Sequence, residues 1–160
     1  MIDDVGERFG RLDTLVLNAA GGLVDDADPG SAMRVNRAAQ RRLAQLALPL
    51  MPTGGRIVFV TSNQAHFYPN KAVQKGCVPL TASRRAGETT LQAMRSEFHR
   101  HGVHFTVVSG EMIDEHTYSY APPLPTIAEF AAAVASAATS PNPTGIVYVG
   151  GSEYLHRRPA

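Results

Sequence analysis

LDTLVLNAAGG, residues 12–22, is the most informative stretch of this 160-residue chain. Its continuous apolar run at residues 14–17 is typical of a short strand that is buried on both faces of a parallel sheet. The run is followed by small side chains, which let another molecule lie against the backbone; these are Asn18, Ala19, Ala20 and Gly21. The stretch therefore predicts a parallel strand whose carboxyl end borders a binding site.

Strands and helices alternate along the rest of the sequence. Short apolar runs predict further strands at residues 56–61, 103–108 and 146–149. Amphipathic patterns that end at glycine or proline predict helices at residues 1–9, 29–50, 79–101 and 126–138. Strands that alternate with helices form right-handed βαβ units. The order therefore predicts an α/β fold in which helices cover both faces of a parallel sheet of about four strands.

Local signals set the ends of individual elements. Asp28 is placed to cap the helix at residues 29–50, and a T-x-x-E pattern at residues 126–129 predicts a capping box. Residues 62–78 are predicted to form a long loop, and residues 109–125 an irregular segment. Apolar residues at helical spacing in the second helix predict a buried stripe that consists of Ala32, Val35, Ala39, Leu43, Leu46 and Leu50.

Composition limits the classes of function. The formal net charge is +1 and apolar residues make up 44% of the chain, so we expect a globular domain with neither nucleic acid nor a membrane as its main partner. Cys77 is the one cysteine, and the first residues have no apolar core, so we expect a reducing, cytoplasmic setting. The basic tail at residues 156–159 is too short to indicate nucleic-acid binding.

Two other predicted strands end in polar or small residues. The second strand ends at Thr61 and Ser62, and the third at Ser109 and Gly110. In open parallel sheets, ligands bind outside the carboxyl ends of the strands. Any one of these ends equally fits an ordinary turn between a strand and a helix, but three at the same edge favour a ligand site.

The order of several short motifs adds a family resemblance. These motifs are RFGRLDTLVLNAAGG, MRVN, GGRIVFVTS, SRRAGE and VHFTVVSG. With these motifs in this order, the chain resembles the carboxyl-terminal, catalytic half of a short-chain dehydrogenase/reductase. The resemblance implies a partial Rossmann-type, doubly wound parallel sheet with three αβα layers, and it implies that residues 1–160 form one domain.

The same resemblance implies an activity and a set of site residues. Members of the family transfer a hydride between NAD or NADP and a carbonyl or an alcohol. By resemblance, Asn36 would hold a water of the proton relay and Ser62 would orient the substrate carbonyl. The residues implied beside the cofactor are Asn18, Ala19, Ala20, Gly21, Thr61 and Gly110, and Thr117 is a looser match to a residue that contacts the carboxamide.

The chain departs from the family at its catalytic Y-x-x-x-K pair. Leu80 stands at the tyrosine position and Arg84 at the lysine position. Arginine supplies positive charge but does not readily release a proton. Tyr68 is the nearest phenol and would serve if its loop folds back over the site, although a surface aromatic is the simpler interpretation. The thiol of Cys77 is shorter than a phenol and poorly placed to replace it.

A second departure concerns the motif that binds the cofactor. No glycine-rich turn precedes Leu12, so the resemblance implies that the chain begins about halfway through the family's cofactor domain. We therefore expect this chain alone to bind NADH or NADPH weakly or not at all, and we expect the strand at residues 14–17 to form an open edge. By resemblance, the helices at residues 29–50 and 79–101 would pair two copies of the chain.

Other interpretations remain open. His99, His101 and His104 cross a helix end, so solvated side chains are favoured over a metal site, and we expect no metal. Two functions follow from the whole sequence. The first is an oxidoreductase in which Ser62 and Asn36 remain active, with Arg84 and Tyr68 in altered roles. The second is a non-catalytic relative that acts as a scaffold or in subunit association.

Overall fold

The structure is a computed structural model that describes residues 1–19, 29–70, 73, 75–110, 125–140 and 145–150. The strands are β1 Thr14–Leu17, β2 Arg56–Ser62, β3 His104–Gly110 and β4 Ile146–Val149. The helices are α1 Ile2–Phe9, α2 Pro29–Met33, α3 Gln40–Ala47, α4 Asn63–Phe67, α5 Val78–Ala93, α6 Arg95–Arg100 and α7 Ile127–Thr139. A π-helical segment, Arg34–Ala39, joins α2 to α3, and short 3₁₀ turns lie at Leu48–Leu50 and Lys75–Cys77.

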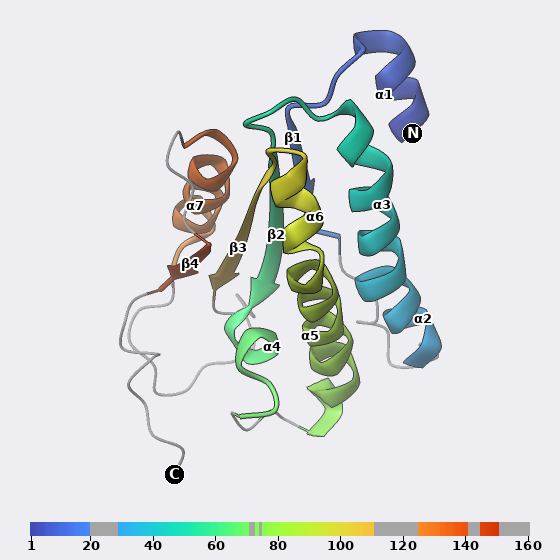
Figure 1. The fold of residues 1–160 in the computed structure, drawn as a ribbon. Coiled ribbons are helices and arrows are strands. Elements are labelled where there is room, and N and C mark those ends of the chain that lie inside the picture. Colours follow the sequence, from blue (N-terminus) through green and yellow to red (C-terminus); the bar gives the residue numbers. More distant parts are fainter. Residues whose placement is uncertain (20–28, 71–72, 74, 111–124, 141–144, 151–160) are drawn as a thin grey trace.

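The four strands form one parallel sheet in the order β1-β2-β3-β4. Helices α3, α5 and α6 lie on one face of this sheet, and α7 lies on the other (Figure 1). All strand arrows point toward the same edge, where α4 lies. The predicted α/β fold of a parallel sheet between two helical layers is therefore confirmed.

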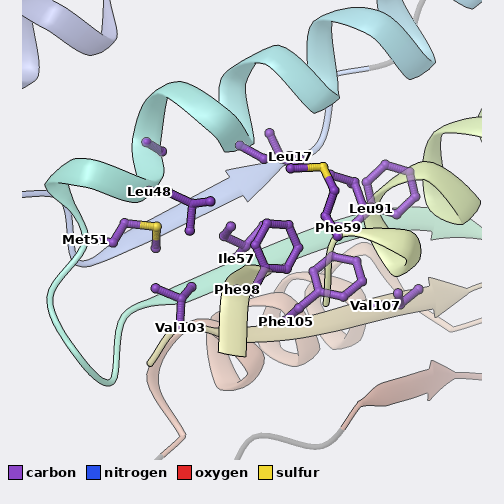
Figure 2. Packing of buried hydrophobic residues seen from close by; sticks show 13 residues of the cluster. Leu17, Leu48, Met51, Ile57, Phe59, Leu91, Phe98, Val103, Phe105 and Val107 are labelled. Carbon is purple, nitrogen blue, oxygen red and sulfur yellow. The ribbon is translucent and has the colours of Figure 1, made fainter. Parts of the chain in front are cut away.

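The main core fills the space between the sheet and the helices α3, α5 and α6. Figure 2 shows the strand side chains Ile57, Phe59 and Phe105 packed against Leu91 and Phe98 of the helices. Alternate residues of the same strands face α7 and form a second, smaller cluster. Burial of these apolar side chains supplies the main driving force for folding. It also determines which polar residues lie at the carboxyl edge of the sheet.

The helix predicted at residues 29–50 is present, but its buried stripe differs from the prediction. Ala32 is buried as expected, whereas Ala39 is exposed. The π-helical segment has a wider turn than an α-helix, so the buried positions there recur four residues apart. The predicted Leu43 is half-buried and packs against the core. The residues that are buried along this helix are Ala32, Asn36, Gln40, Ala44, Ala47 and Leu48.

Two other segments differ from the prediction. Part of the loop predicted at 62–78 is helical, because the Ser62 side chain caps α4 by accepting a hydrogen bond from the Ala65 amide. The helix predicted at 79–101 is present as two helices, α5 and α6, that meet at Met94. The strand predicted at 146–149 and the capping box at 126–129 are confirmed.

β1 forms one edge of the sheet and pairs only with β2 in the described part of the chain. Leu17 is buried against the main core, but Val16 is 42% exposed. The prediction that this strand is buried on both faces is therefore wrong for Val16, while the expected open edge is present. Such an edge offers unpaired backbone groups to another strand.

Candidate functional site

The strand ends meet at one edge of the sheet, as predicted. Thr61 pairs with Ser109 and Ser62 with Gly110 in the parallel register of β2 and β3. All four residues are buried. Asn18 follows β1 at the same edge and, like Ala19, is exposed. The predicted cofactor residues Ala20 and Gly21, the looser match Thr117 and the predicted cap Asp28 lie outside the described residues.

Ser62 is the last residue of β2 and caps the first turn of α4. Its Oγ atom accepts a hydrogen bond from the Ala65 amide at 3.2 Å. Accepting this bond uses an oxygen lone pair and leaves the hydroxyl hydrogen available as a donor. The local structure therefore holds Ser62 in place and still allows it to bind a carbonyl oxygen.

Asn36 lies in the π-helical segment and is only 2% exposed. Its Nδ2 atom donates a hydrogen bond to Ser83 Oγ at 2.9 Å, and Ser83 Oγ donates to the Leu80 carbonyl oxygen at 2.8 Å. These bonds tie Asn36 to the first turns of α5, which also carry Leu80 and Arg84, the residues at the positions of the family's Y-x-x-x-K pair. The structure thus brings Asn36 together with the Leu80–Arg84 turn of α5.

The first turns of α5 offer no proton donor at the family's tyrosine position. The Leu80 side chain is buried, with 8% exposure. Arg84 is half-buried, and burial lowers the pKa of its guanidinium. Because arginine remains protonated at neutral pH even so, Arg84 contributes positive charge and hydrogen bonds rather than a proton.

Tyr68 lies at the carboxyl end of α4, where it lines a hollow with Arg37, Arg41 and Arg85. Ser62 and Asn36 do not line this hollow. The structure therefore does not place Tyr68 in one cavity with the other predicted catalytic residues. Its catalytic role stays a prediction.

A buried polar network, which the sequence did not predict, lies beneath α4. His66 Nδ1 is 2.9 Å from Glu88 Oε1, and His66 Nε2 is 3.0 Å from the Tyr148 hydroxyl. Arg85 Nη1 donates to the same Glu88 oxygen at 3.0 Å. Glu88 is only 1% exposed, so these partners stabilise a carboxylate that would otherwise be strongly destabilised by burial.

Tyr148 contributes a phenol to this network. Burial raises the pKa of its phenol, the negative charge of Glu88 raises it further, and Arg85 lowers it in part. The phenol is thus neutral at physiological pH. With Glu88 bound to His66 Nδ1, the Tyr148 hydroxyl can donate to His66 Nε2, and the chain of bonds fixes the imidazole ring. The network anchors α4, whose first residue follows Ser62.

A row of polar side chains crosses the sheet beside this network. Thr61, Ser109 and Tyr148 are neighbours in the strand register, so their side chains share one face. Ser109 Oγ donates to Asn63 Oδ1 at 2.7 Å. Thr61 Oγ1 is buried and has no hydrogen-bond partner among the described residues. The apolar core therefore gives way to a polar layer at the carboxyl edge.

Gly110 has a packing role that the sequence did not predict. A Cβ atom at this position would lie 2.2 Å from the Phe130 ring of α7. The absence of a side chain is thus explained by the contact with α7. Only the backbone of Gly110 can contribute to a ligand site.

A small apolar hollow lies beside Asn18. It has a volume of about 410 Å³ and is formed by β1 and α7, with Val16, Phe130 and Val134 among its lining residues. The Ala19 carbonyl oxygen, close by, accepts a hydrogen bond from Gln40 Nε2 at 2.7 Å. This end of β1 therefore presents small exposed residues next to an apolar surface.

Within the described ranges, no group of three or more His, Cys, Asp or Glu side chains is arranged to hold a metal ion. No helix in those ranges combines the length and apolarity that crossing a bilayer requires.

A family model and a curated protein match this chain in sequence. The family model described as short chain dehydrogenase matches residues 1–120. A curated relative, 1-cyclohexenylcarbonyl-CoA reductase from Streptomyces collinus, is 30% identical over 127 residues, which are 75% of this chain and 43% of the relative. The chain thus spans less than half the length of that relative.

Solved structures resemble the fold. A short-chain dehydrogenase from Burkholderia cenocepacia in complex with NADP is 25% identical, with a TM-score of 0.74 over 94% of this chain and 69% of the other. A short-chain dehydrogenase from Streptomyces avermitilis is 18% identical, with a TM-score of 0.73 over 96% of this chain and 66% of the other. The second likeness is evidence of fold alone.

Proposed function

The chain belongs to the short-chain dehydrogenase family, and from this membership we propose that it forms the substrate side of an NAD(P)-dependent oxidoreductase. The reaction would interconvert a carbonyl and an alcohol. The observation that supports this most strongly is Ser62, which caps α4 at the carboxyl edge of the sheet and keeps its hydroxyl hydrogen available. We propose that residues 1–160 are the carboxyl-terminal part of a Rossmann-like domain.

The proposed role of Ser62 is to bind the substrate oxygen. A carbonyl oxygen placed at this edge would accept a hydrogen bond from the Ser62 hydroxyl. As the carbonyl is reduced, negative charge develops on that oxygen, so a preorganised donor stabilises the transition state more than the ground state. The His66–Glu88 network supports this role because it fixes α4 from the opposite end.

The residues at the end of β1 fit one wall of a dinucleotide site. Asn18 and Ala19 are small and exposed, and the apolar hollow beside Asn18 can take a ring. NAD or NADP, when bound, would supply the hydride. We propose Thr61 and the Gly110 backbone as further contacts, and Ala20 and Gly21 by resemblance. No glycine-rich turn precedes Leu12, so we expect weak binding by this chain.

A second candidate function follows from Leu80. Carbonyl reduction also requires a proton for the developing alkoxide, and neither the buried Leu80 nor Arg84 can supply it. This favours a non-catalytic relative that retains the scaffold. Self-association and a cytoplasmic location stay predictions, and the exposed β1 edge is the surface best suited to pairing with another strand.

Restoring the family pair separates the two candidates. We expect the double variant Leu80→Tyr/Arg84→Lys to increase NADPH-dependent reduction of a ketone panel by at least about tenfold, since general acid catalysis typically contributes 10²–10⁴-fold. Adding Ser62→Ala should remove that gain. NADPH consumption and alcohol formation would be measured together.

A matched control for this experiment is Leu91→Met, a buried substitution on the same helix away from the site. It should leave the rate unchanged. If the double variant folds and yet reduces no ketone above the rate of the original chain, the scaffold function is favoured instead.

A further inference from the structure

Gln40, the first residue of α3, is a long polar residue on the buried side of its helix. It is only 3% exposed, and Ala44, one turn further along α3, belongs to the main core. Ala39, its neighbour in the π-helical segment, is exposed. The buried side of the helix therefore continues from the π-helical segment onto a glutamine, and π-helical turns inside α-helices occur frequently at functional sites.

The two ends of the Gln40 amide have different surroundings. Its Nε2 atom donates a hydrogen bond to the Ala19 carbonyl oxygen at 2.7 Å. Only the nitrogen of an amide can donate to a carbonyl, so this bond fixes which end of the amide faces the turn after β1. The other end, Oε1, is buried and has no hydrogen-bond partner among the described residues. A buried acceptor without a partner is destabilising, so packing alone does not explain a glutamine at this position.

The bond from Gln40 supports a turn that the sheet holds on one side only. The last pair between β1 and β2 joins Leu17 and Phe59, so Asn18 and Ala19 lie beyond the paired part of β1. On its other side, β1 has no neighbouring strand within the described ranges. Asn18 and Ala19 are both exposed, so core packing does not hold them either. Gln40 is therefore well placed to determine where this turn lies.

From these observations we propose that Gln40 is a positioning residue, which holds the turn at Asn18 and Ala19 where it forms one wall of the cofactor site. This inference rests on the proposed function, which assigns that wall to NAD or NADP. Because its side chain is buried, Gln40 acts through the Ala19 carbonyl rather than by contact with the cofactor. A wall that is ordered before the ligand arrives does not have to be ordered during binding, so it gives a higher affinity.

The proposal predicts that cofactor binding and stability respond differently when the Gln40 amide is lost. Methionine has a similar length without the buried donor and acceptor, and the exposed Ala19 carbonyl can accept a hydrogen bond from water instead. Gln40→Met should therefore leave the urea midpoint of unfolding unchanged or raise it. In an NMR titration the same variant should raise the dissociation constant of NADPH at least about threefold, because a hydrogen bond corresponds to roughly 2- to 12-fold in an equilibrium constant.

The order of the turn can be measured without any cofactor. The NMR order parameter of the Ala19 amide should fall from about 0.85 in the wild type to below about 0.6 in Gln40→Met. Gln40→Leu also lacks the donor but has another shape, so it should behave in the same way and covers a packing defect specific to methionine. The matched control is Gln45→Met, at a half-buried glutamine five residues further along the same helix. It should change neither the order parameter nor NADPH binding.

Two results would overturn the proposal: an Ala19 amide that is as ordered in Gln40→Met as in the wild type, or an NADPH affinity that this variant leaves unchanged. A wild type that binds no NADPH would instead count against the proposed cofactor wall, and the Ala19 order parameter would still decide whether Gln40 holds the turn. The role of Gln40 and the proposed function can therefore fail separately.

Discussion

Gly87 shows how a single residue connects the π-helical segment to α5. A Cβ atom at this position would lie 1.9 Å from the Asn36 carbonyl oxygen. This is a backbone atom, so the two helices would have to move apart. The close approach brings the Asn36 side chain within reach of Ser83.

We therefore predict that Gly87→Ala lowers the free energy of unfolding by at least about 2 kcal/mol, in the range that overpacking usually produces. Urea denaturation monitored by circular dichroism would measure it. The control is Gly76→Ala, where the added Cβ would meet nothing within 4 Å. Equal stability of the two variants would show that α5 and the π-helical segment are not packed as described.

Tyr148 gives a pH-dependent prediction at the same scale. Its pKa is raised in the folded state by burial and by Glu88. The neutral phenol is therefore favoured by folding, and the stability that it contributes is complete below the unfolded pKa near 10. This contribution is lost as the pH rises through the higher folded pKa.

Tyr148→Phe should accordingly show a shallower fall in unfolding free energy than the wild type between about pH 9 and pH 11. Glu88→Gln removes one cause of the shift, so its slope should lie between the two. Denaturant titrations across this pH interval would measure the slopes. A Tyr148→Phe slope as steep as that of the wild type would contradict the account of the buried network.

Among the elements, α7 has the clearest sequence signal. The Thr126 hydroxyl accepts a hydrogen bond from the Glu129 amide at 3.1 Å, and the Glu129 carboxylate accepts one from the Thr126 amide at 2.7 Å. The bond from the Thr126 amide, together with one that the Thr126 hydroxyl donates to the same carboxylate at 2.9 Å, lowers the pKa of Glu129. The contribution of these two bonds is present at neutral pH and is lost as the pH falls through that pKa.

Loss of the cap should destabilise the protein measurably. We expect Thr126→Ala to lower the unfolding free energy by about 1 kcal/mol. Thr139→Ala, at the other end of α7, removes only a bond to the Ala135 carbonyl and should change stability by less than about 0.5 kcal/mol. Thermal unfolding of both variants would test this, and a larger loss from Thr139→Ala would argue against the capping account.

The elements also show what the sequence could and could not reveal. β1 and β4 are short apolar runs, and their predicted bounds agree with the structure. The π-helical segment was not predicted, and within it the Asn36 carbonyl lies against Gly87, a residue far away in sequence. Apolar spacing could not identify Gln40, a polar residue that is buried and donates a hydrogen bond to the Ala19 carbonyl.

The candidate site was also predictable only where local sequence determines it. Ser62 and Gly110 follow apolar runs, so their position at the strand ends could be read directly. The buried network could not, because His66 lies in a segment predicted as loop and its partners are 22 and 82 residues away. The only local signal of this network is Glu88, a glutamate on the core side of α5, and it does not identify its partners.

At the scale of the whole molecule, the fold presents two separate surfaces. One is the carboxyl edge of the sheet, with Ser62 and the polar row beside it. The other is the hollow between α5 and the π-helical segment, which Arg37, Arg41 and Arg85 line. An NADPH titration has to distinguish them, because NADPH carries both a nicotinamide and phosphate groups.

The most direct test of the central claim is the change in backbone NMR shifts when NADPH is added to the Arg37→Glu/Arg41→Glu variant. We predict shifts at the amides of Asn18, Ser62 and Gly110, with a dissociation constant weaker than about 100 μM, and no shifts along α6. NADPH that shifts none of these three amides, even at millimolar concentration, would contradict the assignment of the carboxyl edge as the cofactor wall.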